Sequence, residues 1–395
     1  MPFDRILERS AESAPPQRTK RLRIALFSGN YNYVRDGANL ALNSLVAYLE
    51  RQGAEVLVFS PTTATPAFEP AGTLISVPSF PFPGRGEYRV GLGLTPKIKR
   101  QLLEFQPDLV HLSAPDLLGS RASHFAIAQG WPLVASVHTR WETYFKYYGL
   151  QALLPWARGH LRNFYGRCRQ IYVPSESMAE ALQAEGILGD VRLWARGVDS
   201  VRYSPTHRSE ALRRDWGVDP GRPAVTFTSR LVTEKGLDCL VETFRTLTAQ
   251  GLSFRPIIVG DGPERSSLEQ RLPGAVFTGF LSGEALSAAY ASSDLFFFPS
   301  ATETFGNVTL EAMASGLAAV CANATGSRSL VVDGVTGVLC PIGDTSAFIA
   351  AITGLLQDPA RRTAMGAAAR ARALQYSWET QLAGVYEAYR EIVPG

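Results

Sequence analysis

The sequence predicts an α/β protein built from two doubly wound domains. Short apolar strands alternate with amphipathic helices, which is the pattern of parallel sheets covered by helices on both faces. The alternation begins at residue 21 and starts again at residue 224, after a turn-rich stretch from Arg196 to Pro205. At 395 residues the chain is also longer than one ordinary domain. We therefore expect two Rossmann-like domains that face each other across a cleft.

The first series opens with a strand-like segment, residues 21–29, that ends in a glycine. A helix is predicted from Ala38 to Gln52, because its leucines and valine recur at helical spacing and Gly53 ends the pattern. Further strands are expected at Glu55–Phe59, Asp108–Leu112, Leu133–His138 and Gln170–Val173.

The second series has the same alternation. Its predicted strands are Ala224–Ser229, Arg255–Val259, Val276–Thr278, Leu295–Phe298, Ala318–Cys321 and Gly337–Cys340. Its predicted helices include Lys235–Thr248, Thr345–Leu356 and a final helix from Trp378 to Ile392. In folds of this kind ligands bind outside the carboxyl ends of the strands, so the cleft between the domains is the expected site.

Charge and cysteine content limit the class of protein. Residues 1–200 carry 22 basic and 17 acidic residues, and the remainder carries 17 and 19, an asymmetry too weak for a nucleic-acid-binding protein. It is compatible with a first domain that touches an anionic surface. The four cysteines lack metal-ligand spacing and indicate reduced thiols, and residues 1–20 lack the apolar core of a signal peptide. We expect a cytoplasmic protein, either free or peripherally attached to the inner face of the membrane.

Two cations flank the turn after the first strand of the second series. Arg230 follows the strand and Lys235 opens the next helix, where both are placed to neutralise a diphosphate. The sequence contains no Asp-X-Asp pair of the kind that holds a divalent metal on such a group, so no metal site is predicted. The alternative is a surface ion pair with a helix-capping cation, and for this motif alone the two interpretations are equally good.

Two glutamates, Glu303 and Glu311, bracket a glycine-bearing loop and the start of a small-residue helix. The free N–H groups of a first helical turn bind anions, and those of Phe305, Gly306 and Asn307 are placed to do so. Glu311 can accept hydrogen bonds from ribose hydroxyls and Glu303 from a sugar hydroxyl. A nucleotide sugar combines these groups. The alternative is that Glu303 caps the helix and Glu311 is a solvated helix residue.

His138 ends an apolar strand of the first series, and a histidine there is often only a satisfied polar residue. Together with Thr139, Arg230/Lys235, Gly260-Asp-Gly-Pro263 and Glu303/Glu311, in this order, it resembles the pattern of the retaining glycosyltransferases of family 4. That family has the two-Rossmann architecture called glycosyltransferase B. The resemblance covers almost all of residues 21–390.

The resemblance implies a role for each motif. It implies an acceptor-binding domain over residues 21–200 and a nucleotide-sugar-binding domain over residues 201–377. Residues 378–395 are expected to form a helix that crosses back to the first domain, and residues 1–20 a flexible N-terminus. Arg230, Lys235, Glu303 and His138 are the expected catalytic residues. The expected donor-binding residues are Gly37, Ser229, Gly260, Gly262, Gly279, Phe280, Leu281, Phe305, Gly306, Asn307, Val308 and Glu311.

The loop after the first strand departs from the family pattern, which often has two glycines there. Here Gly37 remains and Asp36 takes the other position, so Asp36 either faces the acceptor or caps the helix. The loop and the aromatic run after His138 supply the candidate acceptor contacts. These are Tyr31, Tyr33, Asp36, Asn39, Thr139, Trp141 and Tyr144.

A basic, aromatic stretch from Trp156 to Arg169 predicts an amphipathic helix. It either docks on anionic membrane lipid or buries its aromatic side in the core with solvated arginines.

The expected function is retaining transfer of a hexosyl unit from GDP-mannose or a UDP-hexose to a hydroxyl acceptor, without a metal or other cofactor. A membrane lipid or glycolipid is the leading acceptor and a growing polysaccharide the second. A nucleotide-sugar epimerase, a sugar phosphorylase and a non-catalytic binding module remain as alternatives.

Overall fold

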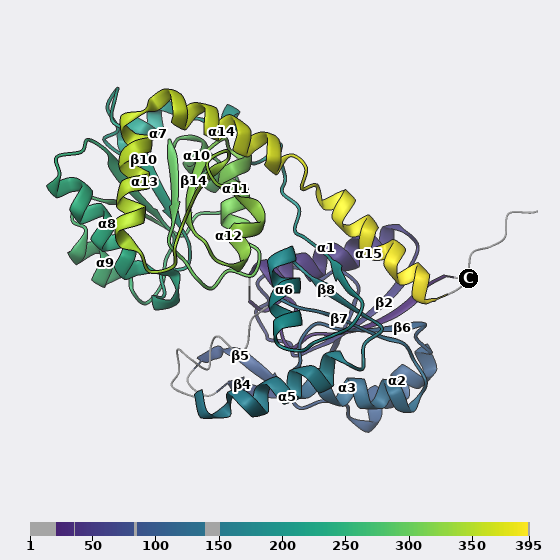
Figure 1. The fold of residues 1–395 in the computed structure, drawn as a ribbon. Helices are drawn as coiled ribbons and strands as arrows, with labels where there is room; N and C mark the ends of the chain where they lie inside the picture. The colour runs from purple at the N-terminus through teal and green to yellow at the C-terminus, as the bar shows by residue number, and fades with distance from the viewer. Residues whose placement is uncertain (1–20, 35, 83–84, 139–150, 394–395) are drawn as a thin grey trace, which may run out of the picture.

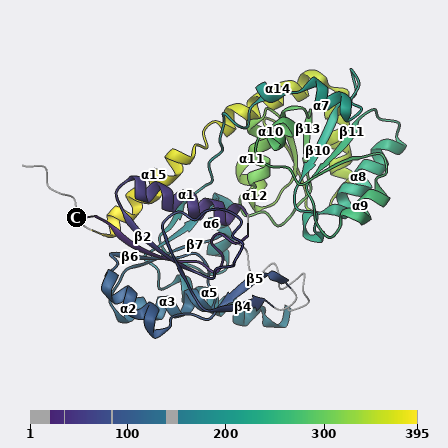
Figure 2. The same ribbon diagram turned by 180° about the vertical axis from the view of Figure 1, so that it is seen from behind.

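The computed structural model describes residues 21–34, 36–82, 85–138 and 151–393. Within these ranges the chain forms two α/β domains, and the last helix returns from the second domain to the first (Figure 1). Figure 2 shows the same two domains from behind, with the returning helix again beside the first. The predicted fold class is confirmed.

The first domain is built on a parallel sheet whose strands lie in the order β3-β2-β1-β6-β7-β8-β9. The strands are β1 (Arg23–Phe27), β2 (Glu55–Ser60), β3 (Thr73–Ser76), β6 (Leu109–Leu112), β7 (Leu133–Ser136), β8 (Gln170–Val173) and β9 (Val191–Leu193). Its helices are α1 (Gly37–Arg51), α2 (Pro96–Phe105), α3 (Leu117–Ala128), α5 (Leu154–Tyr165) and α6 (Glu176–Ala184), with a short 3-10 turn, η1 (Gln151–Leu153), before α5. An antiparallel hairpin, β4 (Ser79–Phe82) and β5 (Arg85–Gly91), extends from it.

The second domain has a parallel sheet in the order β12-β11-β10-β13-β14-β15. The strands are β10 (Ala224–Thr228), β11 (Arg255–Val259), β12 (Val276–Gly279), β13 (Leu295–Phe298), β14 (Ala318–Ala322) and β15 (Gly337–Cys340). Its helical elements are η2 (Pro205–His207), α7 (Glu210–Asp215), η3 (Thr233–Lys235), α8 (Leu237–Ala249), α9 (Arg265–Arg271), α10 (Gly283–Ala291), α11 (Asn307–Ala314), α12 (Thr325–Leu330), α13 (Thr345–Gln357) and α14 (Pro359–Ala373).

In each sheet the strand order reverses once, between β1 and β6 and between β10 and β13. Loops that leave such neighbouring strands diverge to opposite faces and open a crevice at the carboxyl edge, where ligands bind in doubly wound folds. The predicted donor motifs follow β10 and β13, so the topology brings the two motifs to one place.

Helix α15 (Trp378–Ile392) belongs to the core of the first domain. Its apolar face, which includes Leu382, Val385 and Tyr389, packs with α1, β1 and β2. The opposite face of the same sheet is covered by α2, α3 and α5. Removing α15 would therefore expose one side of the first sheet.

The sequence did not predict β3, the β4–β5 hairpin or α14. Strand β3 is half exposed, the hairpin contains Pro81, and α14 is rich in alanine and arginine, so none has a strong apolar pattern. In the described ranges no helix combines the length and apolar character needed to cross a membrane.

Candidate functional site

The loops after β10 and β13 meet at an ion pair between Lys235 and Glu303. The two side chains are about one-fifth exposed, which leaves them accessible to a ligand. Gly236, at φ 75°, permits the approach, since a Cβ atom there would lie 2.7 Å from the carbonyl oxygen of Pro299. The sequence predicted a role for each residue separately, and the structure brings them together.

Arg230 lies in the same turn, directly after β10, and is exposed. Close backbone packing explains why the neighbouring positions 260 and 262 are glycines. A Cβ atom on Gly260 would clash with the carbonyl oxygen of Ser229, and one on Gly262 with that of Leu231. These glycines therefore let the turn after β11 pack on the segment that carries Arg230.

The predicted donor-binding residues Gly279, Phe280 and Leu281 lie at the turn where β12 ends. The backbone N–H of Gly260 donates to the carbonyl oxygen of Gly279 at 2.9 Å, which joins this turn to the glycine turn after β11. Phe280 is 67% exposed, an unusual position for a large apolar side chain, and Leu281 beside it is half-buried. The geometry leaves the Phe280 ring available to a ligand.

Glu311 lies on α11 and is half-buried beside two tyrosines. The Tyr290 hydroxyl donates to its carboxylate at 3.2 Å, and Tyr203 makes a further hydrogen bond. Burial raises the pKa of Glu311 to about 7, although the two tyrosines lower it. The alternative that Glu311 is a solvated helix residue is therefore wrong. No pattern in the sequence indicated the contact with the two tyrosines.

Helix α11 begins without a side-chain cap. Its N-cap is Gly306, at φ 96°, which has no side-chain oxygen to accept from the first N–H groups of the helix. The alternative that Glu303 caps this helix is wrong. The Glu303 carbonyl oxygen instead accepts from the backbone N–H of Gly326 at 2.9 Å, and the buried Phe305 side chain anchors the loop in the core.

The first domain contacts this loop directly. The Thr304 hydroxyl donates to the carbonyl oxygen of His138 at 3.1 Å, and the Ser175 hydroxyl donates to the Thr304 carbonyl oxygen at 3.0 Å. A Cβ atom on Gly37, at the start of α1, would clash with the Asn307 side chain. We call the contact around these five residues the interdomain junction. The predicted residues Gly37, His138 and Asn307 all lie in it.

The His138 side chain is half-buried, and both of its ring nitrogens have partners in its own domain. Its Nδ1 lies 2.8 Å from Nη2 of Arg196, and its Nε2 lies 2.8 Å from the Ser136 hydroxyl. Burial, followed by the charge of Arg196, holds the pKa of His138 well below its usual range. Arg196 was missed in the sequence because a lone arginine after a strand gives no signal of burial.

The predicted acceptor residues of the first loop are mostly structural, which corrects the expectation. Tyr31 and Tyr33 are buried and donate to the carbonyl oxygens of Ala71 and Gly29. Asn39 is buried and donates to the Val34 carbonyl oxygen, while Asp36 caps α1 by accepting from the Asn39 N–H at 2.8 Å. Thr139, Trp141 and Tyr144 lie outside the described residues.

An acidic residue that the sequence analysis missed lies at the switch point of the first sheet. Asp116 caps α3 by accepting from the Gly119 N–H at 2.7 Å, and it lies against Gly29 after β1. Burial raises its pKa to about 6. Its position at the carboxyl edge makes it a better acceptor-side candidate than the buried tyrosines.

The comparisons with known proteins agree with this geometry. The profile described as Glycosyltransferase Family 4 matches residues 35–202, and that described as Glycosyl transferases group 1 matches residues 208–372. A GDP-mannose-dependent alpha-mannosyltransferase of Mycobacterium tuberculosis is 36% identical over 378 residues, which cover 93% of this chain and 97% of the relative. The chain belongs to glycosyltransferase family 4. It is therefore a glycosyltransferase.

Other similar proteins carry different names. Sulfoquinovosyl transferase SQD2 of Arabidopsis thaliana is 34% identical over 92% of this chain and 72% of its own length. Among solved structures, a sucrose-phosphate synthase of Thermosynechococcus elongatus matches with a TM-score of 0.77 at 21% identity, over 94% of this chain and 99% of that one. HepE of Anabaena, in complex with UDP and glucose, matches with a TM-score of 0.73 at 22% identity, over 94% and 100%. At these identities the two structures show the shared glycosyltransferase B fold.

The raised pKa of Glu311 predicts a pH-dependent cost to folding. Its folded pKa of about 7 lies above its unfolded value, so folding disfavours the ionised form, and the cost grows as pH rises from the unfolded pKa to about 7. We expect Glu311→Gln to raise the melting temperature by roughly 2–4 °C at pH 8 and by less at pH 5.5. Thermal unfolding at both pH values measures this. Equal changes in melting temperature at pH 5.5 and pH 8 would contradict the conclusion that burial raises the pKa of Glu311.

Proposed function

We propose that this glycosyltransferase is a retaining, metal-independent hexosyltransferase that uses a nucleotide-diphosphate sugar, with GDP-mannose as the leading donor. The Lys235–Glu303 pair is the observation that carries the proposal. It joins the predicted phosphate-binding motif to the predicted sugar-binding motif at the switch point of the second sheet. A donor placed there has its diphosphate beside Arg230 and Lys235 and its ribose toward Glu311.

The chemistry follows from these positions. The bond between the anomeric carbon and the phosphate oxygen breaks, and the leaving diphosphate is stabilised by Arg230, Lys235 and the uncapped N–H groups of α11. The acceptor hydroxyl attacks the same face, and its proton passes to the departing phosphate oxygen. Glu303 is neutralised by Lys235, which suits a residue that orients a sugar hydroxyl and not a nucleophile.

The donor assignment rests on relatives. Three GDP-mannose-dependent alpha-mannosyltransferases, from Mycobacterium tuberculosis, Mycolicibacterium smegmatis and Corynebacterium glutamicum, are 31–37% identical over 93–94% of this chain. The family resemblance leaves a UDP-hexose as the second candidate, and the structural neighbour HepE of Anabaena has been solved in complex with UDP-glucose. The exposed Phe280 ring is placed to pack on either base.

A membrane lipid is the proposed acceptor class, and the outer surface of α2, α3 and α5 supports it. Together α2, α3 and the stretch from the start of α5 to Arg169 carry eight basic residues and one acidic residue, Glu104. We call it the basic face. Large apolar side chains are exposed in the same region, and Trp156 is the most exposed of them at 69%. Cations beside exposed apolar side chains favour an anionic lipid surface.

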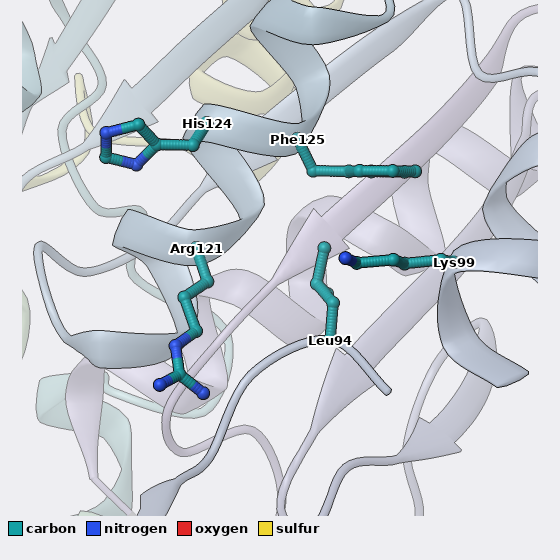
Figure 3. A pocket seen from close by; sticks show the side chains of 5 residues that line it. All are labelled: Leu94, Lys99, Arg121, His124 and Phe125. Atoms are coloured by element: carbon teal, nitrogen blue, oxygen red, sulfur yellow. The ribbon is translucent and has the colours of Figure 1, made fainter. Parts of the chain in front are cut away.

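A pocket of about 500 Å³ lies on the basic face, between α2 and α3 (Figure 3). It is lined by Leu94, Lys99, Arg121, His124 and Phe125, and the Lys99 ammonium lies 5.5 Å from the centre of the Phe125 ring. A cationic pocket with an aromatic wall suits the phosphate and glycerol of a lipid headgroup. This supports peripheral membrane contact through the first domain.

A donor panel tests the proposed activity. We expect nucleotide release from GDP-mannose or one UDP-hexose only when a lipid acceptor is present. NMR of the product should show an axial linkage at the anomeric carbon, as in the donor.

The two cations are tested by substitution. Arg230→Ala and Lys235→Ala should each lower kcat/KM by roughly a hundredfold, as expected for loss of a major electrostatic group. Arg245→Ala, an exposed change on α8, is the control.

The outcomes of that panel separate the alternatives. Conversion of donor without acceptor indicates an epimerase, and a requirement for inorganic phosphate indicates a phosphorylase. Binding without turnover indicates a non-catalytic module. Near-normal turnover in both cation variants would refute the proposed mechanism.

Metal independence is tested with a chelator. Because Arg230 and Lys235 supply the charge for the leaving group, we expect transfer to proceed at an unchanged rate in excess EDTA. Loss of activity that magnesium or manganese restores would refute this prediction.

Membrane contact is tested by vesicle sedimentation. Reversal of two exposed cations of the basic face, Lys99→Glu with Arg162→Glu, changes the charge by four units and should weaken binding to phosphatidylglycerol vesicles by roughly 1,000-fold, at about 1 kcal/mol for each unit of charge near the surface. Arg361→Glu, on an exposed site of the second domain, should have little effect. Equal vesicle binding by the double variant and by Arg361→Glu would contradict the proposal.

A further inference from the structure

A chain of hydrogen bonds runs from α15 through the first sheet to the interdomain junction. The Tyr389 hydroxyl lies 2.6 Å from Nδ1 of His111, and Nε2 of His111 lies 2.8 Å from the Ser136 hydroxyl. The Ser136 hydroxyl is in turn 2.8 Å from Nε2 of His138, whose Nδ1 is 2.8 Å from Nη2 of Arg196. We call this set the buried relay. Tyr389, His111, Ser136 and Arg196 are buried.

The chemistry of arginine fixes the state of His138. A guanidinium group only donates hydrogen bonds, so Nδ1 of His138 accepts and carries no proton. The ring is then neutral with its proton on Nε2, which donates to the Ser136 hydroxyl. Burial lowers the pKa of His111 to about 3, so His111 is neutral as well. The relay therefore holds both rings uncharged, with His111 buried and His138 half-buried.

Both ring nitrogens of His138 are consequently used within the protein. The ring packs edge-to-face on Trp194 at 5.6 Å, and the Arg196 guanidinium lies 4.9 Å from the same indole. The polar group that His138 presents to the second domain is its carbonyl oxygen, which accepts from Thr304 in the donor loop. Fixing the ring therefore also fixes the backbone that meets this loop.

The burial of the Arg196 guanidinium beside the His138 ring is energetically unfavourable. Burial lowers its pKa to about 10, and no carboxylate among the described residues offsets that shift. In the described part of the chain its partners are the Trp194 carbonyl oxygen and ring and the His138 nitrogen. A buried cation that lacks a counter-charge among these residues is destabilising, so an apolar side chain would serve a purely structural role better.

We propose that Arg196 and Ser136 are positioning residues that hold His138 as the Nε2-protonated ring, and that Tyr389 makes the docked C-terminal helix part of this arrangement. The functional part of this inference rests on the proposed function, with His138 as one of the catalytic residues that the family resemblance implies. The tautomer itself does not, and it is measured without any turnover.

The test combines ¹⁵N-histidine NMR with kinetics. We expect the His138 signals, assigned by comparison with His138→Asn, to report a bare Nδ1 and a protonated Nε2. Arg196→Met should abolish that pattern and lower kcat about tenfold, in line with one lost hydrogen bond to a charged group, with little change in donor KM. Arg196→Lys should restore the tautomer and most of the rate.

Tyr389→Phe removes only the distal hydroxyl and guards against failure of Arg196→Met to fold. It should shift the His111 signals and lower kcat about threefold at unchanged donor KM. Its control is Tyr386→Phe on the same helix, whose ring packs on Tyr48 outside the relay. A wild-type tautomer in Arg196→Met, or identical spectra and rates for the two tyrosine variants, would overturn the proposal. A correct tautomer in a protein that does not turn over any nucleotide sugar would count against the proposed function alone.

Discussion

The loop from Pro299 to Gly306 is held from both domains at once. Its Thr304 bonds to His138 and Ser175 of the first domain, while its Glu303 bonds to Lys235 and to the backbone of Gly326 in the second. The same loop ends at the uncapped start of α11. A phosphate that binds at that helix end, as we propose, would contact a segment whose position depends on both sheets, so the proposed donor site is coupled to the contact between the domains.

The Lys235–Glu303 pair adds an electrostatic contribution to the proposed coupling between donor binding and the contact of the two domains. The ammonium of Lys235 has the carboxylate of Glu303 beside it, so these two side chains offset each other's charge. A diphosphate is a stronger partner for the ammonium because it carries more charge. In the proposed donor complex we expect the diphosphate to draw the ammonium away from Glu303, which leaves the Glu303 oxygens to accept from the hydroxyls of the sugar. Under that proposal the two residues of one ion pair supply both donor contacts.

The parts of the fold that the sequence predicted are those with strong local patterns. The buried strands of both sheets are short apolar runs, and α1, α8 and α15 repeat their apolar residues at helical spacing. Strand β3 and helix α14 have no such pattern and were not predicted. Within the site, Lys235 and Glu303 were predicted because each follows a recognisable strand. Tyr203, Tyr290 and Asp116 were not, because their roles depend on which segments become neighbours in space.

The errors in the first loop have the same cause. Tyr31, Tyr33 and Asn39 are polar residues after a strand, which in sequence is the pattern of a ligand-binding loop. The structure turns their polar groups inward onto carbonyl oxygens, because a loop that crosses the edge of a buried sheet must satisfy its own backbone. Conversely, Arg196 is a charged residue that sequence analysis assigns to the surface, yet it is buried against His138. Residues whose burial contradicts their polarity are therefore the ones that a sequence alone misplaces, and here they surround the expected reaction site on both sides.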